Sequence, residues 1–438
     1  MNSVILLLLN LVGFPAAATK NMSSFTTNPV NLGDQTDLQP NGTSPKVSSP
    51  QYLGYHHMTW YVGNAKQAAS YYITRFGFRY IAFQGLETGH RCVSSRVISN
   101  GGVTFVISAP IRDIPEKVTS ASEKQLLAEI HAHLAKHGDA VKDVAFQVDN
   151  VQAVYDRAVR NGAVTVQEPR TLHDEHGEVI TAIIRTYGDT THTLVEKSRY
   201  QGIFMPGFCT VDLEDPIQKY LPKISLEAID HCVGNQDWGE MQAICEYYES
   251  KLAFHRFWSP DDNLLSTSFS AMNSIVMASP PPSLIKMPIN EPAIGLKKSQ
   301  IEEFVDFHSG AGVQHIAFRC HDIVSTVQAL RQRGVEFIDV PSTYYDALHK
   351  RLDAMETDTK GKKQWKLRED LKEVERLKIL IDFDEGGYLL QIFSKPVLDR
   401  PTVFVEIIQR ENFEGFGAGN FKGLFEAIQL EQERRGNL

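Results

Sequence analysis

The sequence of 438 residues has only five cysteines and no Cys-x-x-Cys pair. Such a sparse, odd set argues against a disulfide framework and favours a reducing compartment. The formal net charge of −9 gives no general attraction to nucleic acid or to anionic membranes. Beyond residue 20, no apolar run is long enough to cross a bilayer. We therefore expect a folded core without membrane spans or nucleic-acid partners.

The first 50 residues complicate the choice of compartment. Residues 4–9 are apolar and residues 16–18 are small, as in a secretory signal. No basic residue precedes the apolar run, however, and Asn10 interrupts it. We expect a cytoplasmic protein, with the secretory pathway as the alternative if residues 1–21 act as a signal. Because Asn, Ser, Thr and Pro dominate after residue 20, we read residues 1–50 as a disordered leader.

The rest of the chain repeats one pattern of elements four times. The segments HMTWYVGN (57–64) and DHCVGN (230–235) share Val-Gly-Asn, and each precedes a helical stretch. VKDVAFQV (141–148) and VQHIAFRC (313–320) likewise each precede a helix. Every unit begins with a short strand in which apolar and polar residues alternate. One amphipathic helix follows, and then a sequence typical of further strands. This order predicts a βαβββ unit repeated four times.

Two such units must pair, because one unit alone leaves a sheet face uncovered. We therefore predict an α+β fold with two tandem open-barrel domains, over residues 51–210 and 222–438, joined by residues 199–222. Residues 346–377 form a charged helical insertion in the last unit. A glycine-rich segment at 415–420 precedes an amphipathic C-terminal helix, a combination that can close over a site.

The repeat comparison indicates a metal site in the second half only. His231, His315 and Glu406 lie on three predicted strands. In the first half the comparison matches Asp143 to His315 and Glu196 to Glu406, and it leaves His57 out of register with His231. Two histidines and a carboxylate hold non-haem Fe(II) with adjacent positions left open. Zinc hydrolases also use such a set, but their typical HExxH helix is absent here.

Beyond these three residues, the sequence contains a series of distinctive motifs: VGNAKQAAS (62–70), TYGDTTHTLVEK (186–197), KMPINEP (286–292), GAGVQHIA (310–317), PSTYY (341–345), YLLQIF (388–393) and GFGAGNF (415–421). With these motifs the sequence resembles the 4-hydroxyphenylpyruvate dioxygenase family, from about residue 55 to residue 438. The resemblance implies the vicinal-oxygen-chelate, or glyoxalase-like, form of the predicted barrels, with a non-catalytic first domain and a catalytic iron domain second. It implies one Fe(II) per chain on His231, His315 and Glu406.

The resemblance also implies a set of substrate-pocket residues: Ser274, Asn290, Gln300, Gln391, Phe393, Asn420 and Phe421. Gln391 and Phe393 alternate onto one strand face, which is consistent with a shared pocket. Gln314 also belongs to the family's pocket, but it adjoins His315. We therefore expect Gln314 to point to the opposite face, and we leave it out of the predicted site.

The implied activity is the conversion of 4-hydroxyphenylpyruvate and O2 to homogentisate and CO2 in tyrosine catabolism. The implied partners are a small aromatic 2-oxo acid and O2, and the family suggests a homodimer. One alternative is a hydroxymandelate synthase, which would oxidise the benzylic carbon of the same substrate. The presence of Phe393 favours ring hydroxylation. A second alternative, a non-catalytic binding protein, would be expected to lose a metal ligand, and all three are present.

Overall fold

A computed structural model describes residues 50–114, 120–211, 214–258, 271–358 and 365–437. The predicted disordered leader therefore lies, apart from its last residue, outside the described part of the chain. The described residues form one compact unit. Within the described ranges, no helix is long and apolar enough to cross a membrane. All five cysteines lie in these ranges and are free thiols, as predicted.

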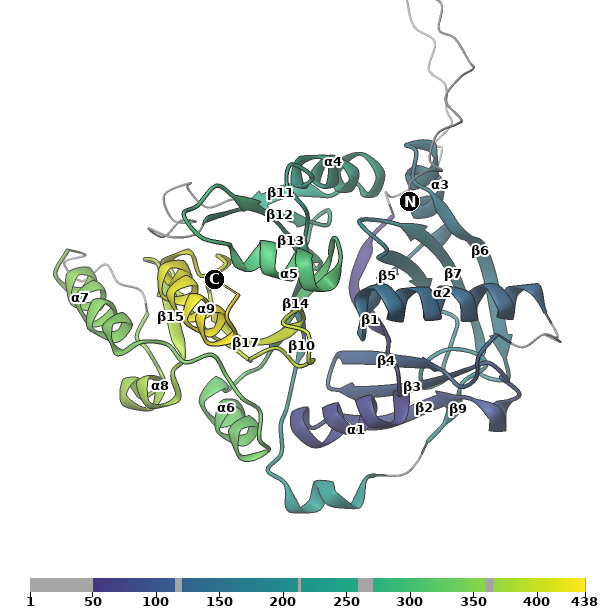
Figure 1. Ribbon diagram of the computed structural model, residues 1–438, viewed down its shortest axis with the longest axis horizontal. Coiled ribbons are helices and arrows are strands. Elements are labelled where there is room, and N and C mark those ends of the chain that lie inside the picture. Colours follow the sequence, from purple (N-terminus) through teal and green to yellow (C-terminus); the bar gives the residue numbers. More distant parts are fainter. Residues whose placement is uncertain (1–49, 115–119, 212–213, 259–270, 359–364, 438) are drawn as a thin grey trace, which may run out of the picture. The chain divides into compact units, whose positions relative to one another are not determined.

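Two mixed sheets form the core of this unit (Figure 1). The first sheet has the strand order β6-β7-β8-β5-β1-β4-β3-β2-β9, and the second has the order β11-β12-β13-β10-β14-β17-β16-β15. The strands of the first sheet are β1 (Tyr52–Tyr61), β2 (Arg79–Gln84), β3 (Val93–Asn100), β4 (Val103–Pro110), β5 (Ala140–Val148), β6 (Thr165–Asp174), β7 (Gly177–Arg185), β8 (Thr191–Glu196) and β9 (Cys209–Thr210). Those of the second are β10 (Ala228–Asn235), β11 (His255–Trp258), β12 (Ala271–Ala278), β13 (Lys286–Ala293), β14 (Gly312–Arg319), β15 (Leu380–Phe383), β16 (Tyr388–Phe393) and β17 (Phe404–Glu411).

The α-helices follow the predicted pattern of one crossover helix in each unit. The crossover helices are α1 (Ala65–Phe76), α3 (Val151–Arg160), α4 (Met241–Leu252) and α6 (Ile323–Gln332). The other helices are α2 (Ala121–His137), α5 (Gln300–His308), α7 (Ser342–Asp358), α8 (Leu371–Leu377) and α9 (Phe421–Arg435). The element order confirms four βαβββ modules and the C-terminal helix. Two modules join through β1 and β5 in one sheet, and two join through β10 and β14 in the other.

Buried contacts between the sheets close the core of the unit. The Phe318 ring lies 5.9 Å from that of Phe105 and 6.1 Å from that of Phe78. His192 on β8 shares a buried hydrogen bond of 2.8 Å with the Tyr248 hydroxyl on α4. The first sheet lies within residues 52–210 and the second within residues 228–411. The domain limits at 51–210 and 222–438 stay a prediction.

The predicted insertion in the last module is helical, as α7 and α8. It also contributes to the core, since Tyr345 and Leu348 on α7 are buried. The Tyr344 hydroxyl donates to Asn420 Oδ1 at 2.7 Å, so α7 also holds the segment that leads into α9. Figure 1 shows α9, in yellow, beside α5.

Strand pairing gives a direct register between the two halves. In the antiparallel pairing of β1 with β5, His57 lies opposite Ala145. In the antiparallel pairing of β10 with β14, His231 lies opposite Ala317. The flanking pairs agree, since Tyr55 faces Phe146 as Ile229 faces Phe318. The prediction that His57 is out of register with His231 is therefore wrong. The prediction aligned the two halves on their shared Val-Gly-Asn, but this motif does not occupy equivalent positions: Asn64 caps α1, whereas Asn235 is still in β10.

The same register corrects the match of Glu196 to Glu406. In the second sheet, Ile407 pairs with Phe318, and Glu406, one residue earlier, pairs with Ala317. In the first sheet, Leu194 pairs with Phe146, the residue equivalent to Phe318. The equivalent of Glu406 is therefore Thr193. Glu196 has another role: its Oε2 accepts from the first backbone N–H of α3, at Val151, at 3.0 Å. Gln409 does the same for Ile323 at the start of α6, at 2.8 Å, so these two residues are equivalent.

Candidate metal centre

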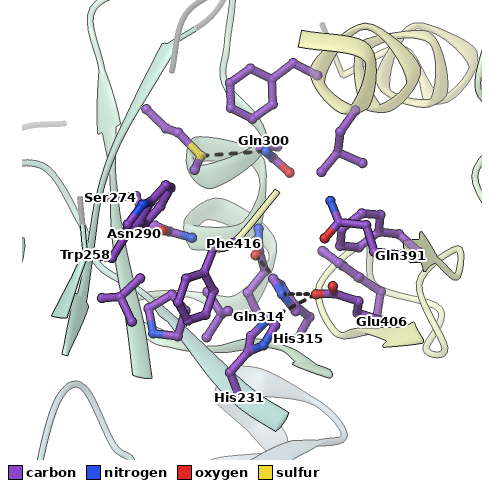
Figure 2. A pocket seen from close by; sticks show the side chains of 18 residues that line it. His231, Trp258, Ser274, Asn290, Gln300, Gln314, His315, Gln391, Glu406 and Phe416 are labelled. Carbon is purple, nitrogen blue, oxygen red and sulfur yellow. Dashed lines mark hydrogen bonds and ion pairs between the residues drawn. The ribbon is translucent and has the colours of Figure 1, made fainter. Parts of the chain in front are cut away.

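Three neighbouring strands bring His231, His315 and Glu406 together. They lie on β10, β14 and β17, and all three side chains are buried or nearly so. Glu406 Oε2 lies 3.0 Å from His231 Nε2 and 3.3 Å from His315 Nε2. Figure 2 shows the three side chains converging at one end of a pocket. Among the described residues, they are the one group of three or more His, Cys, Asp or Glu residues whose ligand atoms all lie within 4.8 Å of one another.

A β-bulge precedes each of the two histidines. The pairing of β10 with β14 skips Asp230 between Ile229 and His231, and it skips Gln314 between Val313 and His315. An extra residue in a bulge turns neighbouring side chains toward the same face. Asp230 Oδ1 accepts from His231 Nδ1 at 2.8 Å, and Gln314 Oε1 accepts from His315 Nδ1 at 2.9 Å. Each imidazole therefore has its Nδ1 occupied, and its Nε2 is available as a metal ligand.

The expectation that Gln314 points away from His315 is wrong for this reason. Strict strand alternation would separate the two side chains, but the bulge cancels the alternation at this position. Gln314 lines the pocket together with His315. Sequence reasoning also missed Asp230, although one signal was available: a polar residue that can accept from Nδ1 stands directly before each histidine.

The charges in the triad stabilise one another. Burial opposes the charged form of His231, but the carboxylates of Glu406 and Asp230 raise the pKa of this imidazole to about 8. Burial would raise the pKa of Glu406, but the two histidines lower that pKa to about 2. Burial lowers the pKa of His315, only partly opposed by Glu406. An anionic carboxylate thus lies beside two imidazole nitrogens.

The unpaired atoms of the triad fit a cation. Glu406 Oε1 is buried and has no hydrogen-bond partner. A buried carboxylate oxygen without a donor is costly unless a cation or a ligand reaches it. Two imidazole nitrogens and a carboxylate on one face suit a divalent transition metal. The three residues can therefore hold one such ion, as the sequence predicted.

The pocket above the triad contains most of the predicted substrate residues. Ser274, Asn290, Gln300, Gln391 and Phe393 all line it. In Figure 2, Ser274 and Asn290 lie on one side of the pocket and Gln391 on the other. Further lining residues that were not predicted are mostly apolar: Val233, Trp258, Met272, Val276, Pro288, Gln314, Phe404, Phe416, Leu424 and Phe425. Phe416 lies in the glycine-rich segment and Leu424 and Phe425 lie on α9, the elements predicted to close over a site.

Two predicted residues are not placed in the pocket. Asn420 is buried, but it is not among the lining residues, and its Oδ1 accepts from Tyr344. Phe421 begins α9, and its side chain lies outside the described part of the structure. Asn420 thus contacts the insertion helix α7.

The pocket carries unpaired polar atoms, and no lysine or arginine lines it among the described residues. Asn290 Oδ1 and Gln391 Nε2 are buried without partners. Gly417 lies close to the Gln391 amide, because a Cβ at this position would come within 2.3 Å of Nε2. Its φ of +75° also favours glycine. The pocket therefore offers an acceptor and a donor between aromatic walls.

The equivalent place in the first sheet lacks two of the three ligands. His57, Asp143 and Thr193 stand where His231, His315 and Glu406 stand in the second sheet. The Phe204 ring packs 5.3 Å from the His57 ring. Burial raises the pKa of Asp143 to about 6, although a hydrogen bond from the Thr191 hydroxyl opposes the shift. Asp143 was correctly matched to His315, and the first half keeps a histidine rather than the carboxylate.

Comparisons with known proteins agree with this geometry. Residues 228–363 match the model of the Glyoxalase/Bleomycin resistance protein/Dioxygenase superfamily. The chain is 56% identical over 423 residues to a 4-hydroxyphenylpyruvate dioxygenase from Pyricularia oryzae, covering 95% of this chain and 99% of the relative. It is 61% identical over 400 residues to one from Neurospora crassa, covering 90% and 95%.

A solved structure extends the likeness to the whole fold. A triple mutant of 4-hydroxymandelate synthase from Streptomyces coelicolor superposes with a TM-score of 0.70 at 28% identity. The match covers 86% of this chain and 98% of that chain. The glyoxalase-like sheets, the buried triad and the high identity over nearly the whole length lead to one conclusion. The chain belongs to the 4-hydroxyphenylpyruvate dioxygenase family.

Proposed function

We propose that this protein is an Fe(II)-dependent dioxygenase that converts 4-hydroxyphenylpyruvate and O2 to homogentisate and CO2. The observation that carries the proposal is the buried triad at the end of a pocket with aromatic walls and unpaired amides. The curated relatives at 56% and 61% identity, both named 4-hydroxyphenylpyruvate dioxygenase, support it over the hydroxymandelate synthase alternative.

In this proposal His231, His315 and Glu406 hold the iron. When bound there, Fe(II) supplies positive charge for a chelating 2-oxo acid and the redox chemistry with O2. The described lining residues provide no lysine or arginine to neutralise the substrate carboxylate. Burying that carboxylate without a counter-charge would be unfavourable. The chain's own side chains therefore bind the substrate well only once the triad is loaded.

The remaining lining residues orient the aromatic part of the substrate. Phe393 and Phe404 form a wall beside His315, with ring centroids 6.0 and 4.8 Å from its imidazole. Gln391 Nε2 can donate to a substrate oxygen, and Asn290 Oδ1 can accept from a phenol hydroxyl. Phe416, Leu424 and Phe425 cover the pocket with apolar surface. These residues hold the ring in one orientation and exclude water from the reacting groups.

The test is a turnover assay of the purified protein with Fe(II), ascorbate and 4-hydroxyphenylpyruvate. Oxygen uptake is followed with an electrode and the product is identified by chromatography. We expect homogentisate with CO2 release in a 1:1 ratio to oxygen consumed, as the stoichiometry of the proposed reaction requires. Hydroxymandelate as the main product would support the alternative. Binding of the substrate without oxygen uptake would support a non-catalytic protein.

Two further properties follow from the family and belong to the same proposal. We propose a homodimer, which sedimentation of the purified protein would test against a monomer. We also propose a cytoplasmic location, supported by the free state of all five cysteines. Fractionation of cells, with sequencing of the mature N-terminus, would test this location against the secretory alternative.

A further inference from the structure

Arg410 lies on β17 four residues after Glu406, and its side chain is only 9% exposed. Its Nε lies 2.9 Å from Asp230 Oδ2, and its Nη2 lies 2.9 Å from Asp230 Oδ1. Two parallel bonds of this kind fix both the position and the plane of the carboxylate. The side chain of Asp230 is 5% exposed, so this ion pair is shielded from solvent. Arg410 thus determines where the Asp230 carboxylate can lie.

The same carboxylate orients a ligand of the proposed metal. Asp230 Oδ1 receives the His231 Nδ1–H at 2.8 Å and also the Arg410 Nη2–H. A continuous chain of contacts therefore runs from Arg410 through Asp230 to His231. His315 differs, because its Nδ1 partner is the neutral amide of Gln314. Only the first histidine has a charged and doubly fixed partner.

The remaining nitrogen of Arg410 holds the turn that forms the pocket wall. Nη1 donates to the backbone carbonyls of Phe413 at 3.1 Å and Gly415 at 2.6 Å. The guanidinium lies 5.2 Å from the centroid of the Phe416 ring. The Phe416 ring in turn lies 5.3 Å from the His231 ring and lines the pocket. One side chain therefore contacts both the support of the metal ligand and the backbone that carries Phe416.

We infer that Arg410 is a positioning residue for the metal centre, which sets the orientation of His231 and the pocket wall at Phe416 together. The inference rests on the proposed function in one respect, namely that the triad holds a metal. A lysine cannot replace Arg410, because an ammonium group lacks the planar fork that reaches both the carboxylate and the two carbonyls. Removing a residue that supports a metal ligand typically weakens metal binding about 10- to 100-fold.

The experiment measures Co(II) binding to the metal-free protein, with no turnover required. Visible absorption gives the dissociation constant and the ligand geometry for wild type, Arg410→Gln, Arg410→Lys, Asp230→Asn and the double variant Asp230→Asn/Arg410→Gln. We expect Arg410→Gln and Asp230→Asn each to weaken Co(II) binding by about 10- to 100-fold with an altered spectrum. We expect the double variant to bind no more weakly than the worse single variant, because the two residues act as one unit.

Arg319→Gln is the matched control. Arg319 lines the same cavity as Arg410 and also pairs with a carboxylate, on Glu227, but it pairs with neither Asp230 nor a residue of the triad. We expect its Co(II) affinity and spectrum to equal those of wild type. Circular dichroism identifies variants that fail to fold, and if Arg410→Gln is one of them, Arg410→Lys and Asp230→Asn decide the question.

Four outcomes would overturn the inference. These are wild-type Co(II) binding in folded Arg410→Gln, full affinity in Arg410→Lys, additive losses in the double variant, and an equal loss in Arg319→Gln. A wild-type protein that binds no Co(II) would instead refute the metal centre and with it the proposed function. The two failures are therefore distinguishable.

Discussion

Thr193 occupies in the first sheet the position that Glu406 occupies in the second. A hydroxyl thus replaces the carboxylate of the triad, and Asp143 replaces the second histidine. His57 alone keeps the ligand type of its counterpart. The His57 ring packs against a phenylalanine ring, and the Asp143 carboxylate already accepts from the Thr191 hydroxyl. Among the described residues, this place therefore has no set of three converging ligands.

The first prediction compares the triad of the second sheet with the equivalent place in the first sheet. His231→Ala, His315→Ala and Glu406→Ala should each lose bound iron and turnover while the fold persists, because each removes one of three ligands. His57→Ala is the matched control, since it removes the equivalent histidine from the first sheet, and Glu196→Ala should behave like it. Metal content by mass spectrometry checks both groups. Normal iron content in His315→Ala would refute the ligand assignment.

The second prediction is that substrate binding depends on the metal. The described pocket has no lysine or arginine, and His231 is already paired with Asp230 and Glu406. The metal-free protein should therefore bind 4-hydroxyphenylpyruvate at least about 100-fold more weakly than the Co(II)-loaded protein, roughly 2.7 kcal/mol. Calorimetry without oxygen measures both affinities. Similar affinities would mean that another group neutralises the substrate carboxylate.

Phe393→Tyr should keep oxygen consumption but divert part of the product toward benzylic hydroxylation. Phe393 lines the pocket beside His315, and an added hydroxyl would crowd the face on which the substrate ring lies. Chromatography of the products measures the ratio. Phe413→Tyr provides a control, because Phe413 is also a buried phenylalanine but does not line the pocket. Homogentisate alone from Phe393→Tyr would remove Phe393 from control of regiochemistry.

Deleting the chain from Gly415 onward should reduce the coupling of oxygen consumption to product formation more than it reduces the iron content. The ligands end at Glu406, whereas Phe416, Leu424 and Phe425 of the deleted segment cover the pocket. The shortened protein should therefore consume more oxygen for each homogentisate formed, because water reaches the reacting groups. An insoluble or iron-free product would indicate a structural helix, and tight coupling in a soluble product would refute a closing role.

The pH dependence of stability should reveal a buried histidine cluster outside the site. His133 and His137 on α2 and His308 on α5 lie in ring contact, with centroids 4.8 and 4.2 Å apart. Burial, with the neighbouring His137, lowers the pKa of His133 and of His308 to about 3 each. Both ring nitrogens of His133 lack partners. The folded protein therefore keeps these two imidazoles neutral at pH values where the unfolded chain protonates them.

The pKa of each of these histidines in the folded protein lies below its value near 6.5 in the unfolded chain. The free energy of unfolding is therefore highest above pH 6.5 and decreases as the pH falls toward 3. Each histidine should reduce the free energy of unfolding by up to about 1.4 kcal/mol per pH unit in this window. Urea unfolding between pH 7 and pH 5 measures the slope. His133→Phe should flatten the slope, whereas His90→Phe, at an exposed position, should leave it unchanged. An equal slope in all three proteins would refute the assignment.

The sequence predicts the fold well, because hydrophobic alternation and helix spacing repeat four times and leave few topologies open. It also predicts the three residues of the triad, since they are chemically distinct and lie on separate strands. It fails at Gln314, where one inserted residue breaks strand alternation. It also fails at the register of His57, because Asn64 of the shared Val-Gly-Asn caps a helix whereas Asn235 is still in a strand. No periodicity locates a bulge, because the hydrogen-bonding partner on the neighbouring strand decides where it forms.

The prediction for Asn420 fails for a different reason, since this residue does not line the pocket. The family resemblance implies that Asn420 is a pocket residue, but α7 supplies a tyrosine hydroxyl that binds it from outside the pocket. Such a contact joins residues 76 positions apart. Local pattern carries no information about contacts of this kind, which depend on how an insertion folds back on the sheet.

The paired bulges also bear on the history of the chain. Both sheets carry them at equivalent positions, before His57 and His231 on one strand and before Asp143 and His315 on the next. An insertion shared by both copies of a duplicated unit indicates that it predates the duplication. The ancestral half thus already had backbone shaped to turn two adjacent side chains toward one face. The two halves therefore differ in residue type at two of the three ligand positions, while the backbone of the first half still presents position 57 as the second half presents position 231.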